Sequence, residues 1–137
     1  KKEIEIGINK KYFYAKLQSN AILIKNRLRK FLSECKKKKD IVMGYGAAAK
    51  GITLINFSKI GHDTLEYIID KNPAKQNKIL PQSNIKIVDL SYLKKIRPKY
   101  IIILPWNLKN EVKDELNFIK NWGGKFVVFV PKFQILK

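Results

Sequence analysis

The ten residues VMGYGAAAKG at positions 42–51 decide how this chain folds. An apolar run at 41–43 is followed at once by glycines and alanines. This order predicts a buried strand that turns tightly into a helix, because glycines let a ligand or another backbone approach closely. The start of the helix would offer unpaired N–H groups and the positive end of its dipole to an anion. Lys50 would add a mobile positive charge.

The glycine spacing in this segment is G-x-G-x-x-x-x-G. It differs from the dinucleotide fingerprint G-x-G-x-x-G and from the P-loop G-x-x-x-x-G-K-[ST]. Two interpretations therefore stay open at this point. The turn contacts a phosphate or nucleotide, or its small residues only permit close packing.

The size and composition of the chain describe one globular domain. A length of 137 residues and 45% hydrophobic content suit a single domain with a real core. No apolar stretch is long enough to span a bilayer, and no signal peptide opens the chain, so we expect a cytoplasmic protein without a membrane partner. The first residue is Lys1, which suggests a fragment. The single Cys35 predicts neither a disulfide framework nor a cysteine zinc site, and we expect it to be a buried packing residue.

The net charge of +18 raises the question of nucleic-acid binding. Of the 29 basic residues only three are arginines, whereas specific phosphate and base recognition favours the arginine fork. The lysines are spread along the chain, apart from a run at 36–39 that suits a helix C-terminus. We therefore do not expect a nucleic-acid partner.

Alternating periodicities divide the chain into helices and strands. Residues 1–11 form a lead-in segment, in which Ile4, Ile6 and Ile8 predict a short edge strand, and the domain proper covers 12–137. Apolar residues at three- and four-residue steps predict a long helix over 12–35. The expected strands are 41–45, 65–70, 85–88, 100–104 and 126–130. The expected helices between them are 47–57, one capped by Asp89, and one capped by Asn107.

This order predicts an α/β protein with a three-layer, Rossmann-like fold. Right-handed crossovers give a mostly parallel five-stranded sheet, in the order 3-2-1-4-5, with helices on both faces. Ligands in such folds bind beyond the carboxyl ends of the strands, where the strand order reverses. Two loops meet there, at 44–51 and 105–107, and Asp70 closes the second strand beside them.

Four segments of the chain resemble one known family. They are GYGAAAKG at 44–51, DKNPAKQ at 70–76 with LP at 80–81, LPWNL at 104–108, and WGGKF at 122–126. Together they resemble the C-terminal domain of bacterial sugar C-methyltransferases over about residues 12–131. Asn77 and Gln82 stand where that family has glycine, a departure that concerns the local turn geometry and not the assignment.

The resemblance implies a methyltransferase that uses S-adenosylmethionine and acts on a deoxysugar carried by a nucleoside diphosphate. Such enzymes also have an N-terminal zinc-binding region and a middle domain that binds S-adenosylmethionine and carries the general base. Neither is present in this sequence, so the chain is expected to contain no catalytic residue and no metal ligand and to be inactive alone. Its part would be to help enclose the nucleotide sugar.

The residues that would line the substrate cleft converge on one edge of the predicted sheet. They are Gly44, Tyr45, Gly46, Ala47, Lys50, Asn72, Lys75, Pro105, Trp106 and Asn107. Asp70 either bonds a ribose or fixes the turn that follows it. Trp106 either stacks on a base or sugar or fills an interface, Tyr45 points into the cleft or packs beneath the turn, and the lone His62 is expected to be exposed.

Two other functions compete with this one. A free-standing Rossmann module could bind NAD, coenzyme A or a similar nucleotide, although the loop lacks the third glycine at the dinucleotide spacing. A basic nucleic-acid-binding domain would lose affinity steeply with added salt.

Overall fold

The computed structural model describes the backbone of residues 2–136 and the side chains of residues 20–136. Within that part, a six-stranded sheet has the order β3-β2-β1-β4-β5-β6. The strands are β1 (Val42–Tyr45), β2 (Tyr67–Ile69), β3 (Lys86–Val88), β4 (Tyr100–Ile103), β5 (Lys125–Val128) and β6 (Gln134–Leu136). The first five are parallel, which confirms the predicted fold class and the order 3-2-1-4-5.

The sixth strand was not predicted. β6 pairs antiparallel with β5, with Phe126 opposite Leu136, and it forms the edge of the sheet. Ile135 on this strand is 44% exposed. A three-residue edge strand with open side chains carries little hydrophobic pattern, and the sequence therefore gives no signal for it.

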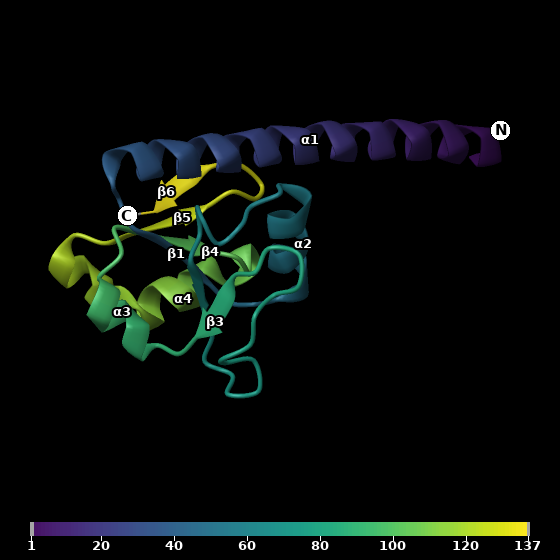
Figure 1. Cartoon of the computed structure of the whole chain (residues 1–137). Coiled ribbons are helices and arrows are strands. Elements are labelled where there is room, and N and C mark those ends of the chain that lie inside the picture. The colour runs from purple at the N-terminus through teal and green to yellow at the C-terminus, as the bar shows by residue number, and fades with distance from the viewer. Residues whose placement is uncertain (1, 137) are drawn as a thin grey trace.

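Helices cover both faces of the sheet (Figure 1). They are α1 (Lys2–Lys38), α2 (Ala49–Phe57), α3 (Ser91–Ile96) and α4 (Lys109–Glu115), with the 3₁₀ helices η1 (Trp106–Leu108) and η2 (Asn117–Trp122) on either side of α4. The backbone of residues 2–11 belongs to α1, so the edge strand predicted at Ile4, Ile6 and Ile8 is wrong. An alternation over only three apolar residues is too short to compete with the continuation of a long helix.

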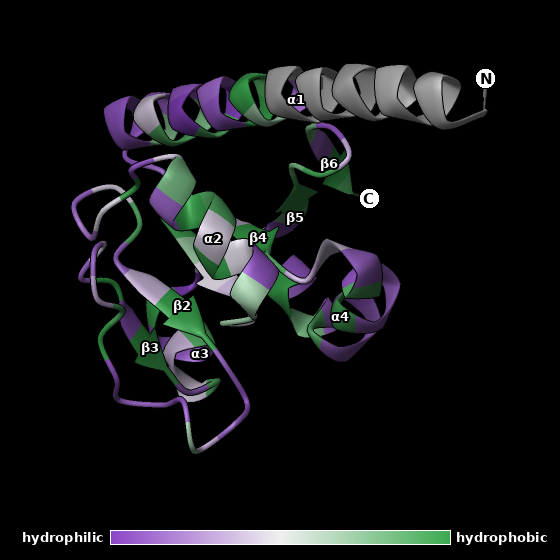
Figure 2. Ribbon diagram, turned by 90° about the vertical axis from the view of Figure 1, so that its right-hand side faces the viewer, coloured by the Kyte–Doolittle hydropathy of each residue, from purple (hydrophilic) through white to green (hydrophobic). Residues whose placement is uncertain are grey.

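Among the side chains of residues 20–136, the core consists of two apolar clusters, one on each face of the sheet. The first joins α1 and α2 to the sheet through residues such as Leu28, Ile55 and Ile102, and the second joins α3, α4 and η2 to it through Leu93, Val112 and Ile101. The two sets alternate along each strand, as the pleat requires. Figure 2 shows the hydrophobic residues concentrated in the strands and α2, with hydrophilic residues on the outer loops.

Burial on both faces explains why 100–104 is a continuous apolar run. Residues 101–104 are each at most 1% exposed, and β4 pairs with β1 on one side and β5 on the other. A strand covered by helices on both faces has no position for a polar side chain. The prediction of a central strand buried on both faces at 100–104 is therefore confirmed.

Candidate functional site

The loops that follow β1, β2 and β4 meet at the carboxyl edge of the sheet. β1 ends at Tyr45, β2 at Ile69 and β4 at Ile103, and all three strands are parallel neighbours. The chain reverses its strand order between β1 and β4. This is the place where the sequence predicted a binding crevice.

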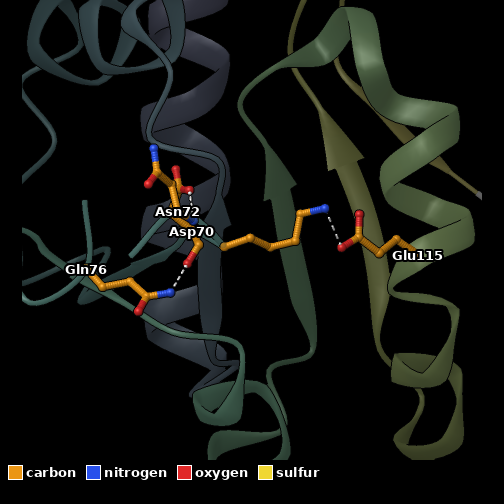
Figure 3. Close-up of polar contacts among 5 residues, drawn as sticks. Asp70, Asn72, Gln76 and Glu115 are labelled. Carbon is orange, nitrogen blue, oxygen red and sulfur yellow. Dashed lines mark hydrogen bonds and ion pairs between the residues drawn. The ribbon is translucent and has the colours of Figure 1, made fainter. Parts of the chain in front are cut away.

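Asp70 connects two of these loops. One carboxylate oxygen, Oδ2, accepts a hydrogen bond of 2.8 Å from the backbone N–H of Ala47. The other, Oδ1, accepts one of 2.8 Å from the backbone N–H of Asn72 (Figure 3). Charge-assisted bonds of this kind are stronger than neutral ones. Of the two roles considered for Asp70, the geometry supports the one in which it fixes the turn.

The loop after Asp70 is bonded to itself and to the glycine turn. Asn72 Oδ1 accepts a bond of 3.0 Å from the backbone N–H of Ala74, and Lys75 Nζ donates one of 3.1 Å to the carbonyl of Ala47. Gln76 Nε2 donates one of 2.8 Å to the carbonyl of Asp70 (Figure 3). Lys75 thus reaches the glycine turn, and its part in substrate binding stays a prediction. The sequence did not predict the bond from Gln76, because no local pattern pairs its amide with the carbonyl of Asp70.

The glycines of the turn lie against the end of β4. Gly46 has φ +87°, and a Cβ there would lie 2.6 Å from Pro105 Cδ. A Cβ on Gly51, in the first turn of α2, would lie 2.5 Å from the Cβ of Leu104. The space that these two glycines leave is therefore filled by the protein itself. This supports the packing interpretation for the glycines.

Lys50 and Asn107 remain open to solvent. Lys50 is exposed in the first turn of α2, and Asn107 is exposed in η1. Asn107 does not cap a helix as predicted, because Trp106–Leu108 form a 3₁₀ turn and α4 begins only at Lys109, with Leu108 before it. No side-chain hydrogen bond caps the N-terminus of α2 at Ala48. Lys50 is thus exposed at the start of α2, and the carboxylate of Asp70 is bonded at Ala47, the residue before the N-cap.

The two aromatic candidates pack within the domain. Tyr45 is 6% exposed and belongs to the second core cluster, and Trp106 is half-buried against the same cluster. Burial raises the pKa of the Tyr45 phenol, and the negative charge of Glu115 raises it further. Gly44 faces the opposite side, where a Cβ would lie 3.1 Å from Ile68. Tyr45 therefore packs beneath the turn.

An ion pair that the sequence did not suggest lies beside these residues. Lys71 Nζ is 2.8 Å from Glu115 Oε1, and the two side chains are 56% and 37% exposed. Figure 3 labels Glu115 and marks this ion pair as a dashed line. The hydrogen bond with Glu115 raises the pKa of Lys71. The two residues are 44 positions apart, so only the folded sheet brings them together.

Two further residues singled out in the sequence lie outside this edge. His62 is exposed in the turn before β2, as predicted. Cys35 is buried in α1 at 5% exposure, also as predicted, and burial raises the pKa of its thiol to about 11.

Comparison with known proteins agrees with this architecture. A family model described as the C-methyltransferase C-terminal domain matches residues 1–131. The chain belongs to the C-methyltransferase C-terminal domain family. This confirms the resemblance stated from the four motifs, although the assignment by itself gives no substrate.

A curated relative of this C-methyltransferase domain is C-methyltransferase NovU from Streptomyces niveus. It is 36% identical over 96 residues, which make up 69% of this chain. The aligned part is 23% of NovU, so the chain corresponds to under a quarter of the length of that relative.

A solved structure shares the fold. The crystal structure of UDP-D-quinovosamine 4-dehydrogenase from Vibrio fischeri aligns with a TM-score of 0.52 and 14% identity, over 72% of this chain and 93% of that one. This likeness supports the Rossmann-like architecture.

Among the helices in the described part of the chain, none is long and apolar enough to cross a membrane.

Proposed function

We propose that this domain belongs to an S-adenosylmethionine-dependent C-methyltransferase that acts on a deoxysugar attached to a nucleoside diphosphate. Within that enzyme, the carboxyl edge of the sheet would form one wall of the nucleotide-sugar site. Membership of the C-methyltransferase family supports the reaction class. The resemblance of the four motifs supports the substrate class.

The observation that carries the role of this edge is the bond from Ala47 to Asp70. It fastens the turn leading into α2 to the loop 70–76, so that the start of α2, Lys50, Asn72 and Lys75 share one edge. We propose that Lys50 and the first N–H groups of α2 face the diphosphate, because a helix N-terminus and a lysine both favour phosphate. Residues 105–107, which follow β4, would line the same cleft beside them.

S-adenosylmethionine has no evident place in the glycine turn of this chain. Pro105 and Leu104 occupy the space that Gly46 and Gly51 leave open. We therefore assign the methyl donor, and the group that removes the proton from the sugar carbon, to the remainder of a longer protein. In this proposal the domain binds and orients the substrate and supplies no catalytic residue.

The test is a calorimetric titration of the complete gene product with thymidine diphosphate. Lys50→Ala should weaken binding by about 1 to 3 kcal/mol, because a charge-assisted bond to phosphate is lost. The matched control is Lys37→Ala, which removes the same charge from the exposed last turn of α1, at the other end of β1. Unchanged affinity in Lys50→Ala, or an equal loss in both variants, would contradict the proposed role of Lys50.

A second arm of the titration separates the competing functions. NAD and a short DNA duplex replace thymidine diphosphate under the same conditions. Binding of NAD alone would favour a nucleotide-binding module of another kind. Binding of DNA that collapses with added salt would favour a nucleic-acid-binding domain.

A further inference from the structure

We infer that Lys71 is a second diphosphate-binding residue, which exchanges its partner Glu115 for a phosphate oxygen when the nucleotide sugar binds. This inference rests on the proposed function, because it needs a diphosphate at the carboxyl edge. It concerns a residue that lies within the motif at 70–76 but was not among those predicted to line the cleft, and the ion pair brings it forward.

The backbone of Lys71 lies beside the glycine turn at which we propose that the phosphates bind. Lys71 lies between Asp70, which is bonded to Ala47 of the glycine turn, and Asn72, whose N–H is bonded to Asp70. Its backbone is therefore held beside that turn. A lysine side chain is a flexible stem that carries a point charge, so the ammonium can turn about this fixed base toward a ligand.

The present partner of Lys71 is easily replaced. Both side chains of the ion pair are more than a third exposed, and exposed pairs of this kind contribute little net stability. A diphosphate carries more negative charge and more acceptor oxygens than one carboxylate. Exchange of the carboxylate for phosphate therefore favours the ammonium and changes the free energy of unfolding little.

The other lysine of this loop is held differently. Lys75 donates to the backbone carbonyl of Ala47 and supports the turn itself. The pair of Lys71 and Glu115, in contrast, links the loop to α4. Both charges act on Tyr45, the last residue of β1: Glu115 raises the pKa of its phenol and Lys71 lowers it. Glu115 thus holds an ammonium in place beside the end of β1 while no ligand is bound.

The chain offers a matched control for this ion pair. Lys99 and Asp40 form the other ion pair found among residues 20–136, with Nζ 3.6 Å from Oδ2. Lys99 precedes β4 and Asp40 precedes β1, so this pair lies at the amino edge of the same parallel strands. Its variants change the charge by the same amount, away from the proposed site.

The experiment measures the affinity of the complete gene product for thymidine diphosphate at fixed ionic strength. Lys71→Met should weaken binding by about tenfold, because a charge-assisted contact is lost. Glu115→Gln should tighten binding by about two- to fivefold, because the ammonium no longer has to leave a carboxylate. The double variant should match Lys71→Met, since Glu115 acts only through Lys71.

The controls and the alternative outcomes separate this inference from the proposed function. Lys99→Met and Asp40→Asn should leave the affinity unchanged within about twofold, since they lie at the far edge. If the unaltered protein binds and Lys50→Ala weakens it, but Lys71→Met and Glu115→Gln do not change the affinity, the inference alone is overturned. If the unaltered protein does not bind thymidine diphosphate, the proposed function fails and this inference fails with it. If Glu115→Gln weakens binding as much as Lys71→Met, the pair is structural, and exchange is excluded.

Discussion

The carboxylate of Asp70 accepts a hydrogen bond of 2.8 Å from the backbone N–H of Ala47, and this bond joins the ends of β1 and β2. The same carboxylate accepts a bond from the N–H of Asn72. An Asn side chain in its place has only one acceptor atom and no charge. We therefore expect Asp70→Asn to lower the free energy of unfolding by about 1 to 3 kcal/mol.

Urea denaturation measures this loss. The control is Asp114→Asn, which removes one negative charge from the exposed surface of α4. Equal stability of the two variants would mean that the bonds of Asp70 contribute nothing measurable.

Gly51→Ala tests whether packing explains the third glycine of the turn. Alanine favours a helix over glycine by about 1 kcal/mol. Its Cβ, however, would lie 2.5 Å from the Cβ of Leu104, and overpacking of this kind costs about 1 to 3 kcal/mol or more. The clash should prevail, because both atoms are close to the backbone and cannot yield.

Thermal unfolding followed by circular dichroism should therefore show a lower midpoint for Gly51→Ala. Thr53→Ala is the control, since Thr53 is exposed in the same helix. It should leave the midpoint unchanged or raise it slightly. A higher midpoint for Gly51→Ala would show that the contact with Leu104 does not constrain this position.

Asp89 provides a pH-dependent prediction. The hydroxyl and the backbone N–H of Ser91 both donate to Asp89 Oδ1, and these bonds lower the pKa of the carboxyl group below 3.8. Because the folded pKa is the lower one, the stabilisation is present above pH 3.8 and disappears as the pH falls through the folded value.

A titration of the Asp89 carboxyl carbon by NMR measures this pKa directly. Ser91→Ala should raise it toward the ordinary value, whereas Ser91→Thr, which keeps the hydroxyl, should leave it lowered. The same pKa in all three proteins would show that the hydroxyl of Ser91 has no influence on Asp89.

Cys35 should be unreactive in the folded protein. It is buried in the first core cluster, and burial raises the pKa of its thiol from 9.0 to about 11. The thiolate is the reactive form, so an aromatic disulfide reagent at pH 8 should label the native protein very slowly. The protein unfolded in guanidinium chloride should be labelled rapidly. Since the folded pKa is the higher one, burial of the neutral thiol stabilises the fold below pH 9 and loses this effect as the pH rises toward 11.

The hydrophobic pattern predicted the central part of the fold. The alternation of strands and helices and the two-sided burial of β4 follow from apolar runs and short turns, and the order 3-2-1-4-5 expected for a doubly wound sheet is confirmed for the first five strands. The errors in the strands fall where this pattern is weak. β6 has only three residues at an open edge, and the alternation at Ile4, Ile6 and Ile8 has a helical backbone.

The sequence predicted which loops meet at the carboxyl edge of the sheet, but not the contacts between them. The sequence indicated that the glycine turn and Asp70 share one edge, and the bond between Asp70 and Ala47 agrees with this. It could not indicate that Pro105 packs against Gly46 or that Lys71 forms an ion pair with Glu115. Contacts between residues so far apart depend on the register of neighbouring strands and the tilt of a helix, which local patterns do not specify.

The place of β1 in the sheet has a consequence for how the domain unfolds. Gly44 lies opposite Ile68 of β2 on one side and opposite Ile102 of β4 on the other. Both halves of the sheet therefore share one strand, and each half loses its backbone hydrogen bonds to β1 when that strand leaves. Loss of β1 separates β2 and β3 from β4, β5 and β6, so we expect the domain to unfold in a single cooperative step.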